Sequence, residues 1–220
     1  GKNVTVDGLA IEGKYDSDIT DHLIQFEDNN ATFQNNVFNV SIADGGDEHG
    51  FAFIALQGSS PADSEILNNE FRDKYTDGGT QNGLYTVQAG GEADRSLIEG
   101  NTIEAMSGIY VASENLTVRS NQINVTAGAV YTSDSGSNTL DNLLIDNNDI
   151  VKTTTYGGST NYAIRLSDGE GMVVQENRID GQSNDFAEGI LINSQSASSN
   201  GLGNVTINSS NEIHNASTAV

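Results

Sequence analysis

Apolar and polar residues alternate in short stretches of this chain, with the period of a β-strand that buries one face. Each such stretch begins a phrase of eight residues. A pair of residues typical of turns follows the alternating residues, and the last residue of the phrase is apolar. The phrase recurs eight times, once with an extra residue, at 4–11, 31–38, 64–71, 96–103, 116–123, 143–150, 172–179 and 205–213. Self-similarity at this interval indicates a repeat architecture in which no single repeat buries its apolar face alone.

Seven of the eight phrases carry an Asn near their end, and Leu9 takes this place in the first phrase. The seven are Asn36, Asn69, Asn101, Asn121, Asn148, Asn177 and Asn211. Amides stacked at the spacing of β-strands, about 4.8 Å, can hydrogen-bond from one repeat to the next and can also satisfy the backbone of a sharp corner. The preceding residue is often Gly or Asn, which tolerate the left-handed conformation. We therefore predict that this row of Asn residues is structural.

A shorter apolar phrase follows each of the first seven long ones. It occurs at 23–26, 50–53, 83–87, 108–111, 129–132, 163–166 and 189–192. Two strands in each repeat, joined by corners and stacked in parallel, would bury one continuous aliphatic core. The Asn residues are spaced by 20 to 34 positions, which indicates loops of different length inserted into a constant rung.

The sequence thus predicts an all-β fold, a single-stranded parallel β-helix of about eight rungs, with residues 1–220 forming one domain. The repeat resembles that of right-handed parallel β-helices in pectate-lyase-like proteins, including the carbohydrate-binding and sugar-hydrolase repeats of secreted proteins. This resemblance implies the handedness and a carbohydrate-related role. The chain opens directly in a strand and closes on Ala219 and Val220 without an evident polar cap. We therefore expect a segment of a longer polypeptide with flanking domains.

The amino-acid composition restricts the partners, the chemistry and the location that this protein can have. The formal net charge is −22, from 31 acidic and 9 basic residues, which argues against nucleic acid as a partner. The chain has no Cys, so disulfides and thiolate chemistry are excluded. No apolar run approaches the ~18 residues of a membrane span. An acidic coat of this kind favours an extracellular or cell-surface location, in a saline environment.

The inserts between long and short phrases locate a candidate site. Two adjacent inserts, 104–107 and 124–127, have four residues each, whereas the others have 9 to 12. The tight repeats should form a saddle on one flank. Onto its floor the alternation places one outward residue of each short phrase, in the order Gln25, Ala52, Tyr85, Tyr110, Tyr131, Arg165 and Leu191. Tyr rings can stack on sugar faces, and Arg165 can pair with a uronate or sulfate. Tyr156 lies in a neighbouring insert.

An enzymatic alternative rests on the charged insert after residue 71. A uronate lyase needs a base and a cation, so Lys74 or Arg72 could act as base with Arg165 as the clamp. An inverting glycosidase needs two separated carboxylates, for which Asp73 and Asp77 are the nearest pairing. The catalytic signatures of polygalacturonases and alginate epimerases are missing from the sequence. We therefore favour a binding module or scaffold over a lyase, epimerase or glycoside hydrolase.

A Gly-rich insert at 43–50 holds the densest acidic group. Asp44, Asp47 and Glu48 together with backbone carbonyls could chelate Ca²⁺, although their spacing differs from that of an EF-hand loop. Calcium is the one cofactor that the sequence suggests. The expected function is that of a secreted or cell-surface β-helix of adhesin or scaffold type, with a flank that binds a polysaccharide, a cell-surface glycan or another partner.

Overall fold

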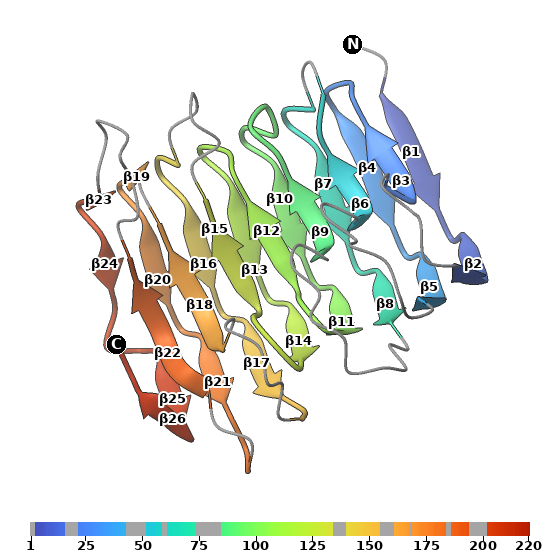
Figure 1. Cartoon of the computed structure of the whole chain (residues 1–220). Helices are drawn as coiled ribbons and strands as arrows, with labels where there is room; N and C mark the ends of the chain where they lie inside the picture. The colour runs from blue at the N-terminus through green and yellow to red at the C-terminus, as the bar shows by residue number, and fades with distance from the viewer. Residues whose placement is uncertain are drawn as a thin grey trace.

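The chain folds as a parallel β-solenoid (Figure 1). The computed structural model describes residues 3–15, 22–42, 52–58, 61–73, 85–133, 140–154, 161–167, 169–183, 186–193 and 202–220. These residues contain strands and turns and no helix. Three parallel sheets of eight strands each run along the solenoid, and a rung here means one strand from each sheet. The predicted all-β solenoid fold is therefore confirmed.

The sheets take every third strand along most of the chain. The first sheet comprises β1 (Val4–Asp7), β4 (Ala31–Gln34), β7 (Glu65–Leu67), β10 (Leu97–Glu99), β13 (Thr117–Arg119), β16 (Leu144–Asp146), β20 (Val173–Gln175) and β24 (Thr206–Ile207). The second comprises β2 (Ala10–Tyr15), β5 (Val37–Ile42), β8 (Glu70–Asp73), β11 (Thr102–Ala105), β14 (Gln122–Val125), β17 (Asp149–Lys152), β21 (Arg178–Asp180) and β25 (Glu212–His214).

Seven strands of the third sheet overlap the seven short phrases of the sequence, and the last strand follows them. This sheet comprises β3 (Ile24–Phe26), β6 (Ala52–Leu56), β9 (Tyr85–Ala89), β12 (Ile109–Val111), β15 (Val130–Thr132), β18 (Tyr162–Leu166), β22 (Phe186–Ile192) and β26 (Ala216–Thr218). A further pair, β19 (Gly169–Glu170) and β23 (Leu202–Gly203), forms a small two-stranded sheet.

The expectation of two strands per rung was wrong, because each rung has three. The long phrase is not one strand but two, separated by the predicted corner. At this corner a residue with positive φ precedes the Asn, as at Asn68 (φ 54°) and Gly100 (φ 69°). The same conformation occurs at Gly8, Asn35, Ser120, Asn147 and Glu176. The predicted left-handed corner is thus confirmed, and it turns the chain from the first sheet into the second.

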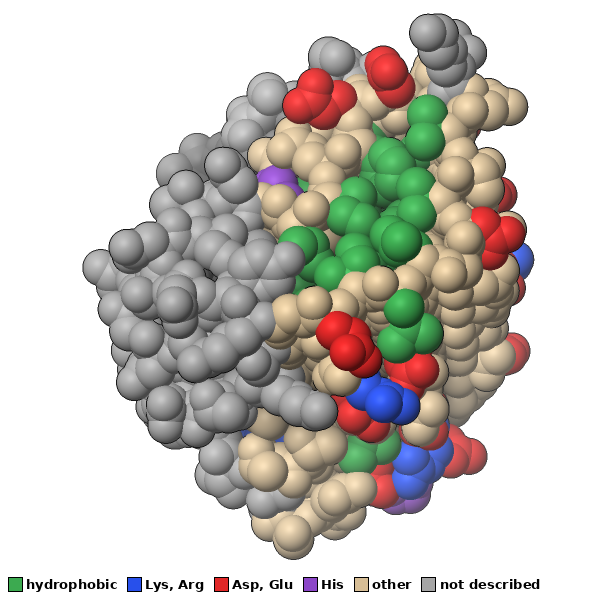
Figure 2. Space-filling model, turned by 90° about the vertical axis from the view of Figure 1, so that its right-hand side faces the viewer, with side chains coloured by type: hydrophobic (Ala, Val, Ile, Leu, Met, Phe, Trp, Pro, Cys, Tyr) green, Lys and Arg blue, Asp and Glu red, His purple; other side chains and the backbone are tan. Residues whose placement is uncertain are grey.

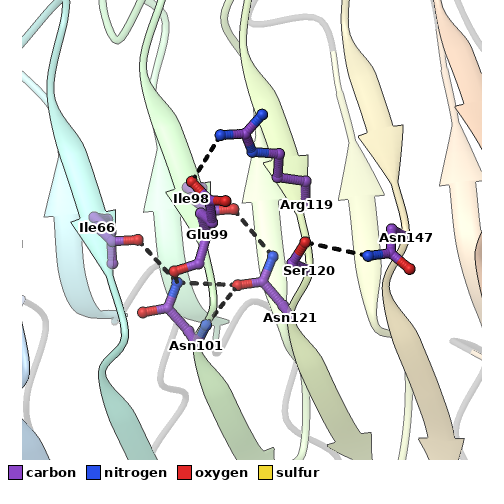
Figure 3. Close-up of polar contacts among 8 residues, drawn as sticks. All are labelled: Ile66, Ile98, Glu99, Asn101, Arg119, Ser120, Asn121 and Asn147. Atoms are coloured by element: carbon purple, nitrogen blue, oxygen red, sulfur yellow. Dashed lines mark hydrogen bonds and ion pairs between the residues drawn. The ribbon is translucent and has the colours of Figure 1, made fainter.

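The Asn row forms a continuous ladder, as predicted. The backbone N–H and the Nδ2 of Asn101 both donate to Oδ1 of Asn121, over 2.9 and 3.0 Å, while Nδ2 of Asn121 donates to the carbonyl of Ile98 (Figure 3). The same pattern links Asn36 to Asn69 and continues to Asn211. The ladder satisfies buried amides at every corner, and we call it the asparagine ladder.

The core is continuous from rung to rung because equivalent positions align. In the second sheet Ile103, Ile123, Ile150 and Ile179 stand in register, each fully buried. Towards the N-terminus, Phe71 and Phe38 continue this column, and their rings stack at 5.1 Å. Phe33 of the first sheet and Phe53 of the third are buried beside Phe38. Stacking of like residues therefore fills the interior.

The end of the solenoid that carries β1, β2 and β3 presents apolar side chains (Figure 2). Val4 and Leu9 are 43% and 42% exposed there, beside the partly buried Val6, Ile11 and Phe26. Leu9 occupies the first position of the asparagine ladder, and its N–H donates to Oδ1 of Asn36. The core is thus visible from this end.

Candidate ligand-binding surface

The outer face of the third sheet carries the row of residues that the sequence singled out, with two corrections. Strand pairing aligns Gln25, Ala55, Gln88, Tyr110, Tyr131, Arg165 and Leu191 in successive rungs. The prediction placed Ala52 and Tyr85 in this row, whereas Ala55 and Gln88 occupy those positions. Ala52 and Tyr85 pair with each other three residues earlier.

Tyr85 nevertheless joins the same surface, because the start of β9 is irregular. The N–H groups of Thr86 and Val87 both donate to the carbonyl oxygen of Gly108, over 2.8 and 3.2 Å. Two N–H groups of β9 thus share one carbonyl oxygen, and the in-and-out alternation is interrupted here, since the neighbouring Thr86 and Val87 are both buried. Val87 points into the core, while the ring of Tyr85, two residues earlier, lies 5.0 Å from that of Tyr110 on the outer face.

Four tyrosine rings form one packed group, which we call the tyrosine cluster: Tyr85, Tyr110, Tyr131 and Tyr162. The rings of Tyr85 and Tyr131 are nearly parallel at 6.0 Å, and Tyr110 lies 5.5 Å from Tyr131. Tyr162 extends the cluster, at 6.1 Å from Tyr131. The first three side chains are partly buried, so they neither enter the core nor stand free in solvent. Tyr162 is buried, and the sequence did not single it out.

Arg165 lies over this cluster. Its guanidinium carbon is 4.9 Å from the ring centre of Tyr131 and 5.7 Å from that of Tyr162, within the range of a cation–π contact. Burial raises the pKa of Tyr85 and that of Tyr162. At Tyr162 a hydrogen bond with Arg165 acts in the opposite direction and lowers the pKa. Both phenols therefore stay neutral near pH 7 and can donate hydrogen bonds.

Arg165 also differs from the other described arginines in its charge partners. Each of the others has an ion pair with a carboxylate: Arg72 with Glu70, Arg95 with Asp63, Arg119 with Glu99, and Arg178 with Asp149 and Asp180. Arg165 has no ion pair among the residues that the structure describes. Its charge thus remains uncompensated by a described carboxylate in an otherwise acidic molecule.

Two polar atoms of the same row lack a hydrogen-bond partner within the described part of the chain. They are Oε1 of Gln88 and Nε of Arg165, both shielded from solvent. A buried polar group without a partner costs about 1–3 kcal/mol, so folding alone does not account for either one. The row thus combines aromatic faces, an uncompensated cation and unsatisfied polar atoms.

The tight connections predicted beside this row are present. Residues 106–108 link β11 to β12, and residues 126–129 link β14 to β15. Met106 and Ala127 are buried, so both turns lie close against the core. Most of the longer inserts that would form the walls of the saddle lie outside the described residues.

The remaining predicted site residues are scattered or undescribed. Arg72 lies on the second sheet, where strand pairing aligns it with Asn39 and Glu104, so it does not face Arg165 on the third sheet. Asp73 is partly buried at the end of β8. Lys74, Asp77 and Tyr156 lie outside the described residues, as do the calcium candidates Asp44, Asp47 and Glu48. The lyase arrangement of Arg72 with Arg165 is therefore not assembled.

Within the described ranges, no group of three or more His, Asp or Glu side chains is arranged to hold a metal ion. No helix long and apolar enough to cross a membrane occurs in that part of the chain.

Comparison with family models, curated proteins and solved structures finds no match. The fold and this surface therefore define a parallel β-solenoid with an aromatic outer strip.

Proposed function

We propose that this chain is a β-helix module of a secreted or cell-surface protein, of the pectate-lyase-like type, and that it binds a polysaccharide on the outer face of its third sheet. The observation that carries the proposal is the tyrosine cluster with Arg165 across it. Four rings and one cation converge on neighbouring strands of a single face.

The chemistry of this surface suits a sugar chain. Aromatic faces stack against the apolar faces of sugar rings, and neutral phenols bond to sugar hydroxyls. Strands of one sheet are about 4.8 Å apart, so residues of successive rungs offer repeated contacts to a polymer that crosses the strands. Arg165 adds a preference for a carboxylate or sulfate on the sugar, because a guanidinium forms paired hydrogen bonds with such groups.

The same surface favours binding over catalysis. Arg72 is engaged by Glu70 on the second sheet, away from Arg165. No pair of carboxylates accompanies the tyrosine cluster among the residues placed in its row. The acidic coat, with a net charge of −22, supports a saline extracellular setting and keeps polyanions away from most of the surface. An anionic glycan would then bind only where an uncompensated cation stands.

Binding to uronate, sulfated and neutral polysaccharides tests the proposal. We expect the chain to bind a uronate or sulfated polymer, and Tyr110→Ala to weaken this binding about fivefold or more, as loss of one stacking contact of about 1 kcal/mol predicts. Leu144→Ala is the matched control, because Leu144 is a partly buried residue of the first sheet. Equal loss in both variants would contradict the proposal.

Chain cleavage is measured in the same samples. Turnover of any polymer would show that the chain has the alternative function, that of a polysaccharide lyase, epimerase or glycoside hydrolase.

The variant Arg165→Gln distinguishes specific binding of an anionic sugar from general electrostatic attraction. It should abolish the preference for anionic over neutral polymers, whereas Arg119→Gln on the first sheet, which removes the same charge, should preserve this preference.

A further inference from the structure

Lys152 occupies a position that belongs to the apolar core. It is the last residue of β17, and strand pairing aligns it with Val125 of the preceding rung, which is itself aligned with Ala105. Both Lys152 and Val125 are fully buried. Moving an ammonium group out of water is costly, and buried lysines accordingly shift towards the neutral amine.

A carboxamide and an aromatic ring lie beside the end of the Lys152 side chain. Its Nζ contacts Oδ1 of Asn161, and it lies 5.3 Å from the ring centre of the fully buried Phe186. The backbone of Asn161 is fixed as well, because its carbonyl oxygen accepts hydrogen bonds from Ala187 and Glu188, over 2.8 and 3.2 Å. An amine and a carboxamide are thus held together under an aromatic cover.

We propose that Lys152 and Asn161 form an intramolecular isopeptide bond. The neutral Nζ amine attacks Cγ of the Asn161 carboxamide and forms a C–N bond. A proton passes from Nζ to the departing amide nitrogen, the bond between Cγ and Nδ2 breaks, and one ammonia leaves. The product is a secondary amide between the two side chains. Nothing is oxidised or reduced, and no co-reactant is consumed.

Three features of this site favour such a reaction. Holding an amine beside a carboxamide replaces a bimolecular encounter by an intramolecular one, which can contribute very large effective concentrations. Burial removes the water that would otherwise compete and favours the uncharged nucleophile. The secondary amide product also carries no charge, so it suits this apolar column better than an ammonium does.

The crosslink would fasten the insert that precedes the tyrosine cluster. It joins the end of β17 to the residue directly before Tyr162, nine positions later in the chain. Closing this short loop restricts the unfolded chain and fixes the start of β18, on which Tyr162 and Arg165 lie. This inference does not depend on the proposed ligand, since the bond either forms or does not form in the free protein.

Intact mass spectrometry of the denatured full chain tests the proposal directly. We expect a mass lower than that of the 23.2 kDa sequence by one ammonia. After tryptic digestion the bond following Lys152 should remain uncleaved, and fragment ions from cleavage between residues 152 and 161 should be missing. A mass equal to that of the sequence would overturn the proposal.

Three variants assign the mass loss to this pair of residues. Lys152→Arg and Asn161→Ala should each restore the full mass of the variant sequence, and Asn161→Asp should lose water in place of ammonia. An Asn that cyclises to a succinimide elsewhere in the chain also loses ammonia, but that loss would persist in Lys152→Arg. Persistence of the loss in both Lys152→Arg and Asn161→Ala would therefore refute the bond, whether or not these variants fold fully.

Discussion

Replacement of Asn121 by Ala tests whether the asparagine ladder stabilises the fold. The Asn121 side chain accepts two hydrogen bonds from Asn101, donates one to the carbonyl of Ile98 and donates one to Oδ1 of Asn148. Asn121 is 2% exposed, so water cannot replace these partners without opening the corner. The substitution leaves the Asn101 N–H without its acceptor inside the protein.

The magnitude follows from this count. One buried N–H without a partner costs about 1–3 kcal/mol, and each other lost hydrogen bond contributes about 0.5–1.5 kcal/mol. Because Asn148 keeps the N–H of residue 121 as a donor and Asn101 keeps the carbonyl of Ile66 as an acceptor, neither amide is fully stripped. We expect a loss of about 3 kcal/mol in the free energy of unfolding, or about 6–12 °C in melting temperature for a chain of this size.

Urea unfolding and calorimetry measure this loss, and Asn211→Ala is the matched control. Asn211 is the last Asn of the ladder and is partly buried, so water can reach the groups that its side chain leaves behind. Its replacement should cost about 1 kcal/mol. Solenoids can unfold in parts, so both variants must be compared by two probes of unfolding. If Asn121→Ala cost no more than Asn211→Ala, burial of the ladder would not be what stabilises it.

Three further predictions concern a corner, acid stability and calcium. Gly100→Ala should destabilise the fold by about 1 kcal/mol or more in urea unfolding, because φ is 69° there and an added Cβ would collide with Oδ1 of Asn68. Arg95 lowers the pKa of Asp63 by a hydrogen bond, so the stability that this pair adds is present at neutral pH and lost below about pH 4; Asp63→Asn should flatten this part of the pH profile. If the acidic insert at 43–50 binds Ca²⁺, calcium should raise the melting temperature more than sodium at equal ionic strength, and equal shifts would indicate charge screening alone.

The sequence predicted those parts of the fold that every rung repeats. The alternation of the long phrase, its left-handed corner and its Asn recur so often that their common geometry is the parallel stack. The number of strands per rung was missed, because a corner inside the phrase leaves the in-and-out alternation of its apolar residues almost unchanged. Val118 and Ile123 are both buried, although they lie on different sheets. A second buried row, in which the Ser64 N–H donates to Oγ of Ser96, gave too few repeats to be recognised.

The candidate surface was predictable only in part, because single irregularities decide it. Tyr110, Tyr131 and Arg165 follow from counting along regular strands. Tyr85 fell on the correct face for an incorrect reason, since the count assumed a regular alternation that the start of β9 does not have. The core and the asparagine ladder fix the fold in every rung, whereas the outer face of the third sheet contributes little to either. The side chains on that face differ from rung to rung, so its departures from the repeat are the best guide to function.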